Sequence, residues 1–277
     1  MIYARALVAL LLALLLGSCD VEFDAANPNP PLSPGSTVVP LLEWDTTMKS
    51  TFNIVFVPDT SYGDISVQAN RQRFFDDIEK VIENGYWQNN AYWINFPRFN
   101  YYYMTAGGSA AAPTSGICPT VTWPAQVDTD AAFADVVLLL HPNELRDCRW
   151  GKKVTSEPTS YRTVVHESSH ALFNLPDEYC CDGGYRVLAP VMYSSLNSCN
   201  TDVANAGWRN CSSFVATSGA GATWWRSEDS TTDIMSGGGD VVLEMGQADW
   251  TVMKGVLSAR GPTNSPSVFA PSAWNRP

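Results

Sequence analysis

The stretch SYRTVVHESSHALFNLPDEY, residues 160–179, limits the possible folds more than any other part of this sequence. It predicts a helix that ends near Pro176, because proline disfavours helical geometry at the residue before it and Asn174 can adopt the left-handed conformation that ends helices. His166 and His170 are four residues apart, so they project from one face of that helix, one turn apart. The chain must therefore fold around a helix that presents two imidazoles together.

Two imidazoles at this spacing can bind one zinc ion, at ~2.0–2.1 Å each. Glu167 is rotated off the ligand direction, so it is suited to act as general base on the water of the metal. The alternative is an amphipathic helix that carries histidines on its polar face. However, two of the three histidines of the chain fall here, and the helix stops where a third ligand is needed. We therefore predict a catalytic site with one zinc ion, held by His166 and His170.

The third ligand is expected from the segment that follows the helix. Asp177 is our prediction, and Glu178 is the alternative. His141, at the end of a predicted strand, is a weaker candidate, because only folding could bring it near. Tyr179 and Tyr193 are candidates to stabilise an oxyanion, and a purely structural role is the alternative for both.

The motif HESSHALFNLPDEY resembles the signature of the IgA-peptidase-like metallopeptidases, bacterial zinc proteases with a histidine pair, a leucine and an Asp-Glu-Tyr end. FNIVFVPDTSYG is similar to the early strand and loop of that family, although its Gly-Asp-Gly is not reproduced. FADVVLLLHPNE is similar to the strand ahead of the active-site helix. The resemblance covers residues 50–258, strongly at the motif and loosely elsewhere. It implies a zinc-dependent endopeptidase that acts on a protein or peptide substrate.

The family looks related to the metzincins, which implies a metzincin-like fold with a methionine-containing turn under the metal. Met235 in TDIMSGGG is our candidate for that turn, Met192 in APVMYS is the second, and either could be a core methionine. The usual third ligand of metzincins lies six residues after the second histidine. That position is Pro176, which has no ligating side chain, so this chain departs from the pattern and Asp177 would replace the missing ligand.

The beginning of the chain predicts export and a lipid anchor. Arg5 precedes an apolar run over residues 6–16, which is too short for a comfortable membrane span. LGSC then resembles a bacterial lipoprotein box, which implies cleavage of a signal peptide, residues 1–18, and acylation of Cys19. An ordinary signal peptide is the alternative. Residues 19–45 are predicted to be a tether, and the protein is expected at the cell envelope, held to the membrane by its lipid.

Six further cysteines follow Cys19, an even number that suits three disulfides in an oxidising compartment. The spacings contain no CxxC, which disfavours a cysteine zinc site, and the adjacent pair is not expected to bond to itself. The connectivity stays open among these residues: Cys118, Cys148, Cys180, Cys181, Cys199 and Cys211.

Apolar runs and helical spacing alternate along the chain, which favours an α/β (α+β) fold with a mixed twisted sheet. The catalytic domain is predicted to span residues 46–260, followed by a flexible tail, residues 261–277. Its C-terminal part, residues 180–245, is expected to consist of long loops pinned by disulfides. The other expected elements are strands within 51–63, 99–104 and 135–141 and helices over 67–85 and 248–259.

A formal net charge of −11 argues against a nucleic-acid partner, because an acidic chain repels phosphate backbones. We expect a monomer. Two other classes of function stay open from the sequence. One is a surface-binding lipoprotein, an adhesin or glycan binder with a vestigial zinc site, which would use the aromatic run over residues 86–104. The other is a zinc hydrolase that acts on something other than a peptide.

Overall fold

The computed structural model describes residues 35–42, 51–179, 185–206, 210–215, 221–228, 233–236 and 244–260. The predicted signal peptide, Cys19, Cys180, Cys181 and the C-terminal tail lie outside these residues. Within the described residues, no helix combines the length and the apolar character needed to cross a membrane.

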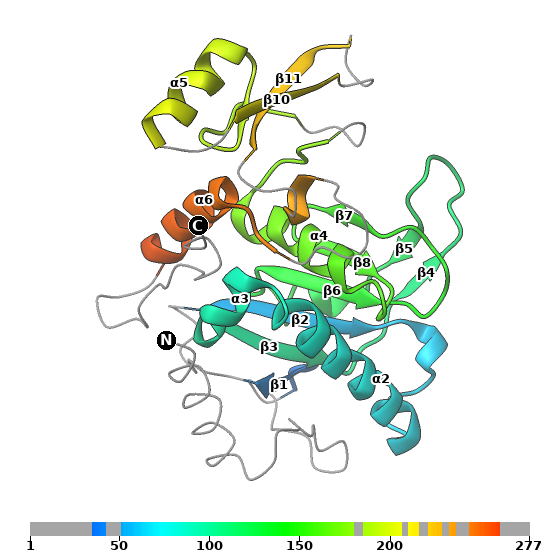
Figure 1. Cartoon of the computed structure of the whole chain (residues 1–277). Helices are drawn as coiled ribbons and strands as arrows, with labels where there is room; N and C mark the ends of the chain where they lie inside the picture. The colour runs from blue at the N-terminus through cyan, green and yellow to red at the C-terminus, as the bar shows by residue number, and fades with distance from the viewer. Residues whose placement is uncertain are drawn as a thin grey trace.

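A mixed sheet forms the centre of the molecule, as the sequence predicts, and it has six strands (Figure 1). Its four middle strands run parallel, and an antiparallel strand closes each edge. In spatial order the strands are β1 (Val38–Leu42), β3 (Phe99–Met104), β2 (Phe52–Pro58), β6 (Val136–Leu140), β8 (Lys153–Ser156) and β7 (Cys148–Trp150).

Each face of the sheet is covered by a different part of the chain. Alternate side chains of the strands pack on one side against the helices, and the intervening ones pack against residues 106–134. The helical layer contains α2 (Gln68–Val81), α3 (Asn90–Ile94), α4 (Tyr161–Phe173) and α6 (Gln247–Ala259). The opposite layer contains a hairpin of β4 (Ser109–Ala111) and β5 (Thr120–Thr122) and the short helix η4 (Ala125–Val127).

Strand β1 corrects the predicted tether, which was expected to run to residue 45. Residues 38–42 pair antiparallel with β3 and belong to the folded domain. Val38 and Val39 are buried, and the carboxylate of Asp130 accepts hydrogen bonds from the N–H and the hydroxyl of Thr37. The proline- and serine-rich composition concealed this strand, because an edge strand tolerates Pro40 where a central strand would not.

The C-terminal part is also more regular than predicted. A second sheet of three antiparallel strands, in the order β10-β11-β9, packs with α5 (Leu196–Ala206) where long loops were expected. A disulfide between Cys199 and Cys211 joins the helix to β10. The strands are β9 (Met192–Tyr193), β10 (Asn210–Val215) and β11 (Thr223–Glu228). Because β10 is nowhere fully buried, its sequence lacks the apolar alternation that would have revealed it.

The aromatic run is mostly core, and it fixes the position of α4. After α2 the chain makes one wider turn, η2 (Ile82–Tyr86), which places Gly85 against the backbone of α4. A Cβ atom added at Gly85 would lie 3.4 Å from the Tyr161 carbonyl oxygen. The hydroxyl of Tyr86 then lies 2.6 Å from that of Ser168, and the hydroxyl of Tyr92 lies 3.0 Å from that of Ser169. These two buried hydrogen bonds fix the rotation of α4 about its own axis.

Candidate metal centre

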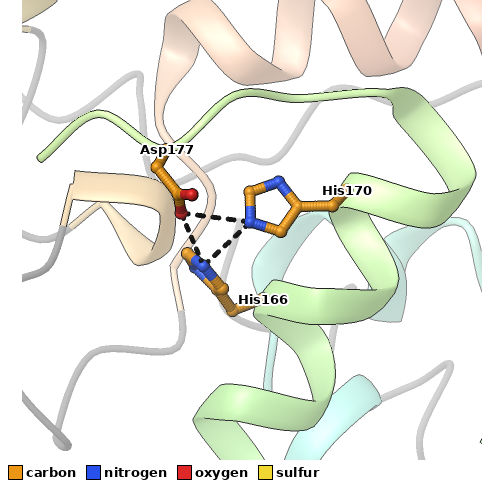
Figure 2. A group of neighbouring side chains, drawn as sticks. All are labelled: His166, His170 and Asp177. Atoms are coloured by element: carbon orange, nitrogen blue, oxygen red, sulfur yellow. Dashed lines mark hydrogen bonds and ion pairs between the residues drawn. The ribbon is translucent and has the colours of Figure 1, made fainter. Parts of the chain in front are cut away.

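Helix α4 ends as the sequence predicts. Phe173 is its last residue, and Asn174 adopts a left-handed conformation with φ 56° and ψ 34°. The Asn174 N–H donates to the carbonyl of His170, which satisfies one of the last free carbonyls of the helix. The chain then reverses direction, so that Asp177 returns to the face of the helix that carries the histidines (Figure 2).

Three side-chain atoms converge in front of this face (Figure 2). The Nε2 atoms of His166 and His170 lie 3.0 Å apart, and Asp177 Oδ1 lies 3.0 Å from the first and 3.1 Å from the second. Both imidazoles are buried, whereas the side chain of Asp177 is 12% exposed. The structure thus brings together the two histidines and the aspartate that the sequence predicts.

The remaining nitrogen of each imidazole is engaged by a backbone carbonyl. His166 Nδ1–H donates to the Ile234 oxygen at 3.0 Å, and His170 Nδ1–H donates to the Leu175 oxygen at 2.6 Å. A carbonyl can only accept, so each ring keeps its proton on Nδ1 and directs the lone pair of Nε2 towards the centre. Two lone pairs and a carboxylate oxygen that face one another require a positive species between them, either a proton or a metal ion.

The titration behaviour of the cluster follows from this geometry. Burial is the largest single influence on the pKa of His166 and lowers it. Asp177, which accepts from Nε2–H once the ring is protonated, and the nearby carboxylates outweigh burial, so the pKa is raised. Burial also acts to raise the pKa of Asp177, and the two histidines more than reverse that effect, so its pKa lies well below its usual range. The carboxylate is therefore ionised throughout the physiological range.

The donor set fits a zinc ion. Zinc takes nitrogen and oxygen ligands in tetrahedral geometry, and ligand bonds of ~2.0–2.1 Å place neighbouring ligand atoms ~3.3 Å apart. The three separations here are 3.0, 3.0 and 3.1 Å, so small side-chain movements would accommodate the ion. The partners behind each imidazole are those that commonly orient metal-binding histidines. Three protein ligands leave a fourth position open, which is the arrangement of catalytic rather than structural zinc sites.

Glu167 lies beside the cluster, outside the ligand set. Its side chain is largely buried, and burial raises its pKa. The two histidines and Arg149 oppose that shift, since a positive charge nearby favours the ionised carboxylate. The Arg149 Nε atom lies 4.0 Å from Glu167 Oε2.

The carboxylates of Asp177 and its neighbour Glu178 belong to two different clusters. The carboxylate of Glu178 lies with those of Asp233 and Asp249 in a second, fully buried group, whose oxygens are within 4.8 Å of one another. The alternative ligand of the sequence prediction is therefore directed away from the histidines. The Glu178 N–H nevertheless donates to the Met235 carbonyl at 3.0 Å, which joins the turn after α4 to the segment beneath the site.

Met235 is buried in η5 (Ile234–Ser236), the short helix whose first carbonyl orients His166. The structure thus brings our preferred methionine next to the candidate metal ligands. Met192 is also buried, in strand β9 of the small sheet, and packs in the same hydrophobic core.

The other sequence candidates occupy different positions. His141 is buried, donates through Nδ1–H to the Asn143 carbonyl, and has its Nε2 atom 4.0 Å from Asp147 rather than at the cluster. Tyr193 is buried within the small C-terminal core beside Cys199. The ring of Tyr179 lies 6.0 Å from that of His166, centroid to centroid, so Tyr179 is the tyrosine that the fold places at the site.

Sequence reasoning missed several groups that shape the centre. The Leu175 and Ile234 carbonyls are backbone groups, so no particular residue type in the sequence marks them. Arg162 donates to the Ile234 oxygen at 2.8 Å, and His166 donates to the same oxygen. Arg162 lies one turn before His166 on α4, and that spacing is the signal in the sequence that could have identified Arg162. Arg149 reaches Glu167 from strand β7, and only the sheet order shows that this strand lies at the site.

Comparison with known proteins adds no family assignment. The chain matches no family model, and none of the curated proteins is similar to it at a significant level. The function must therefore be argued from the geometry of the site.

Proposed function

We propose that this chain is a zinc-dependent endopeptidase, related to the metzincins through the IgA-peptidase-like metallopeptidases that its motif resembles. The observation that carries the proposal is the convergence of His166, His170 and Asp177, with both Nδ1 protons committed to backbone carbonyls. Glu167 supplies the further group that such a reaction needs, because a purely structural metal site has no use for an adjacent carboxylate.

A zinc ion bound by these three ligands would polarise the substrate carbonyl and acidify a water molecule. The residues of the chain supply the ligand charge, hold the imidazoles in the ligating tautomer and transfer the proton. Asp177 contributes the one negative charge of the ligand set, and the Leu175 and Ile234 carbonyls hold the imidazoles in the ligating tautomer. Glu167 accepts the proton of the attacking water and returns it to the leaving amine. Its burial beside Arg149 keeps that carboxylate partly shielded from bulk solvent.

The alternative of an adhesin or glycan binder has lost its main support. It relied on an exposed aromatic groove, yet the tyrosines at 86, 92 and 101–103 are buried. Of that run, Trp93 is exposed, with 45% of its surface accessible. Trp87 and Phe96, which are partly buried, pack against its ring, so the aromatic surface left open is a small cluster around Trp93 rather than a groove along the run.

The decisive experiment compares the zinc-loaded wild type with Glu167→Gln on a peptide library. We expect Glu167→Gln to retain one zinc ion per chain and to lose roughly 10²–10⁴ in turnover, the usual contribution of a positioned acid–base group. Glu144→Gln, an exposed glutamate on the loop before β7, is the matched control and should behave as wild type. Full activity in Glu167→Gln would exclude this mechanism, and product analysis would show whether the bond cleaved is a peptide.

We also propose that the protein is an exported lipoprotein, acylated at Cys19 and anchored at the cell envelope. The sequence LGSC supports this, and so do the disulfides Cys118–Cys148 and Cys199–Cys211, which are typical of an oxidising compartment. Cys19→Ala should abolish labelling by radioactive palmitate and move the protein from the membrane fraction to the soluble one. Unchanged labelling would refute the anchor.

A further inference from the structure

Two segments that are distant in sequence meet at the candidate metal centre. The turn after α4 supplies Asp177, and η5 supplies the Ile234 carbonyl that orients His166. A backbone hydrogen bond joins the two segments, from the Glu178 N–H to the Met235 oxygen at 3.0 Å. The position of Asp177 relative to His166 therefore depends on how the turn and η5 are held together.

Arg226 contacts both of these segments from the three-stranded sheet. Its Nη1 atom donates to the Glu178 carbonyl at 2.6 Å and to the Ser236 carbonyl at 3.2 Å. Its Nε atom donates to the hydroxyl of Ser212 at 3.0 Å. Ser236 is the last residue of η5, and Glu178 directly follows Asp177, so one guanidinium group bridges the backbones of the two segments.

The backbone of Arg226 is itself well fixed. Arg226 lies on β11, the central strand of its sheet, opposite Ser212 on β10 and Met192 on β9. Met192 is buried in the main hydrophobic core, and the disulfide Cys199–Cys211 joins β10 to α5. Because β11 is paired on both sides, the guanidinium group starts from a defined position relative to the core.

The three contacts of Arg226 suit an arginine better than a lysine. The planar guanidinium group presents its N–H donors in a rigid fork, so it can serve two carbonyls and a hydroxyl at once. The ammonium group of a lysine, at the end of a flexible chain, could serve one of these carbonyls without fixing the distance between them. Arg226 is partly buried, so its donors are partly shielded from competing water.

The charge of Arg226 also acts on the buried acidic cluster, where it opposes the raised pKa of Asp233. Compensation of that cluster would stabilise the fold without concerning the metal. The two roles have different requirements. Charge compensation needs a cation, whereas holding two carbonyls at a fixed separation needs the planar fork.

We infer that Arg226 is a positioning residue of the proposed zinc site, because it fixes the turn that carries Asp177 relative to the segment that orients His166. The inference rests on the zinc site of the proposed function and extends that site to the three-stranded sheet. Arg226 contacts the two segments at backbone carbonyls, so it acts on the ligands through the backbone. Glu178→Gln, which changes only a side chain, leaves these contacts in place.

Zinc affinity and a cobalt spectrum test the inference without relying on turnover. In Arg226→Gln we expect zinc affinity, measured by competition with a chromophoric chelator, to fall roughly 10–100-fold, the usual cost of losing an outer partner of a metal site. The visible absorption of the cobalt-substituted protein depends on the geometry of the ligands. It should therefore differ between Arg226→Gln and the wild type.

Arg98→Gln is the matched control. Arg98 Nη1 also donates to two backbone carbonyls, that of Leu257 at 2.8 Å and that of Arg260 at 3.1 Å, at the C-terminal end of α6. Its substitution removes the same kind of contact from a different part of the fold. Stability should fall, while zinc affinity and the cobalt spectrum should stay those of the wild type.

Two milder variants separate positioning from charge. Arg226→Lys keeps the positive charge but not the fork, so its zinc affinity should remain below that of the wild type. Full affinity in Arg226→Lys would mean that charge alone is needed, and the inference would be wrong. Ser212→Ala removes only the partner of Nε and should show a smaller loss in the same direction. It provides the test if Arg226→Gln does not fold.

A double-mutant cycle shows whether Arg226 acts through the position of Asp177. If it does, Arg226→Gln should cost less zinc affinity in Asp177→Ala than in the wild type. Equal losses in both backgrounds, or an unchanged affinity and cobalt spectrum in Arg226→Gln, would overturn the role of Arg226 and leave the zinc site intact. A wild type that binds no zinc would instead overturn the zinc site, and this inference with it.

Discussion

Asp177 and Glu178 are adjacent in the sequence, yet their carboxylates belong to two clusters of opposite character. Asp177 joins two imidazoles at a site that is open enough to leave its side chain 12% exposed. Glu178 joins Asp233 and Asp249 in a group that is buried throughout. Both clusters bring three potential metal ligands together, so proximity alone does not distinguish them.

The difference lies in where the protons are. In the first cluster, the Nδ1 protons are fixed on backbone carbonyls, and the inner atoms are acceptors without a donor among them. In the second, the burial of three carboxylates together raises the pKa of Asp233 and so favours a proton on it, and the Met235 N–H donates to Asp233 Oδ1 at 2.8 Å. The first arrangement is suited to a metal ion, whereas in the second a proton and a backbone N–H already serve Asp233.

The largest expected effect is the difference in zinc affinity between a variant of Asp177 and a variant of Glu178. Asp177→Ala removes a direct ligand of the proposed zinc ion and should lower zinc affinity at least roughly 100-fold, since even the loss of an outer hydrogen-bond partner costs roughly 10–100-fold. Glu178→Gln keeps the size of the side chain and should still bind one zinc ion per chain. Competition with a chromophoric chelator measures both. Zinc loss in Glu178→Gln but not in Asp177→Ala would reverse the assignment of the two clusters.

Removal of the metal should give the next largest effect. A ligand at 100 times its dissociation constant stabilises the folded state by ~2.7 kcal/mol, so the zinc-loaded wild type should melt several degrees above the chelated protein. Asp177→Ala should show little difference between the two conditions. If the variant gains as much stability from zinc as the wild type does, the ion binds elsewhere.

The smallest effect concerns the buried acidic cluster. Burial is the main cause that raises the pKa of Asp233, and the hydrogen bonds from Met235 and Asp249 and the charge of Arg226 only partly oppose it. The folded state therefore holds this proton more tightly than the unfolded state does. The corresponding stability is fully present below the usual pKa of an aspartate and is lost as the pH rises through the raised value.

Asp233→Asn cannot ionise, and its amide can still accept from Met235 and donate to Asp249. Its stability relative to the wild type should therefore increase with pH, by up to ~1.4 kcal/mol per pH unit between the two pKa values. Urea denaturation of both proteins with chelator present, from acid to neutral pH, measures this difference. A difference that does not change with pH would mean that folding does not raise the pKa of Asp233.

Local patterns in the sequence predicted the central elements well. Strand β3 is confirmed over residues 99–104, and α4 ends at the left-handed Asn174 as expected. These features depend on short-range chemistry: apolar runs, proline geometry and the helical repeat. The edge strand β1 and the small C-terminal sheet were missed because their stability comes from partners distant in sequence, such as Asp130 for Thr37.

The same distinction holds within the site. The spacing of His166 and His170 and the turn to Asp177 are local, so the sequence was sufficient to place all three together. The Ile234 carbonyl and Arg149 come from other elements, and only the tertiary fold brings them to the helix. Glu178 shows the limit of local reasoning, because the direction of a side chain after a turn depends on what lies on each side of the chain.

The two carbonyls behind the imidazoles imply an order of assembly. The partner of His170 is five residues away along the chain, whereas that of His166 is 68 residues away. Because synthesis proceeds from the N-terminus, one ring can be held as soon as the helix closes, and the other must wait until residue 234 has emerged. High-affinity capture of the proposed zinc ion would therefore be a late event, and a polypeptide truncated within the C-terminal part would carry an incompletely oriented histidine pair.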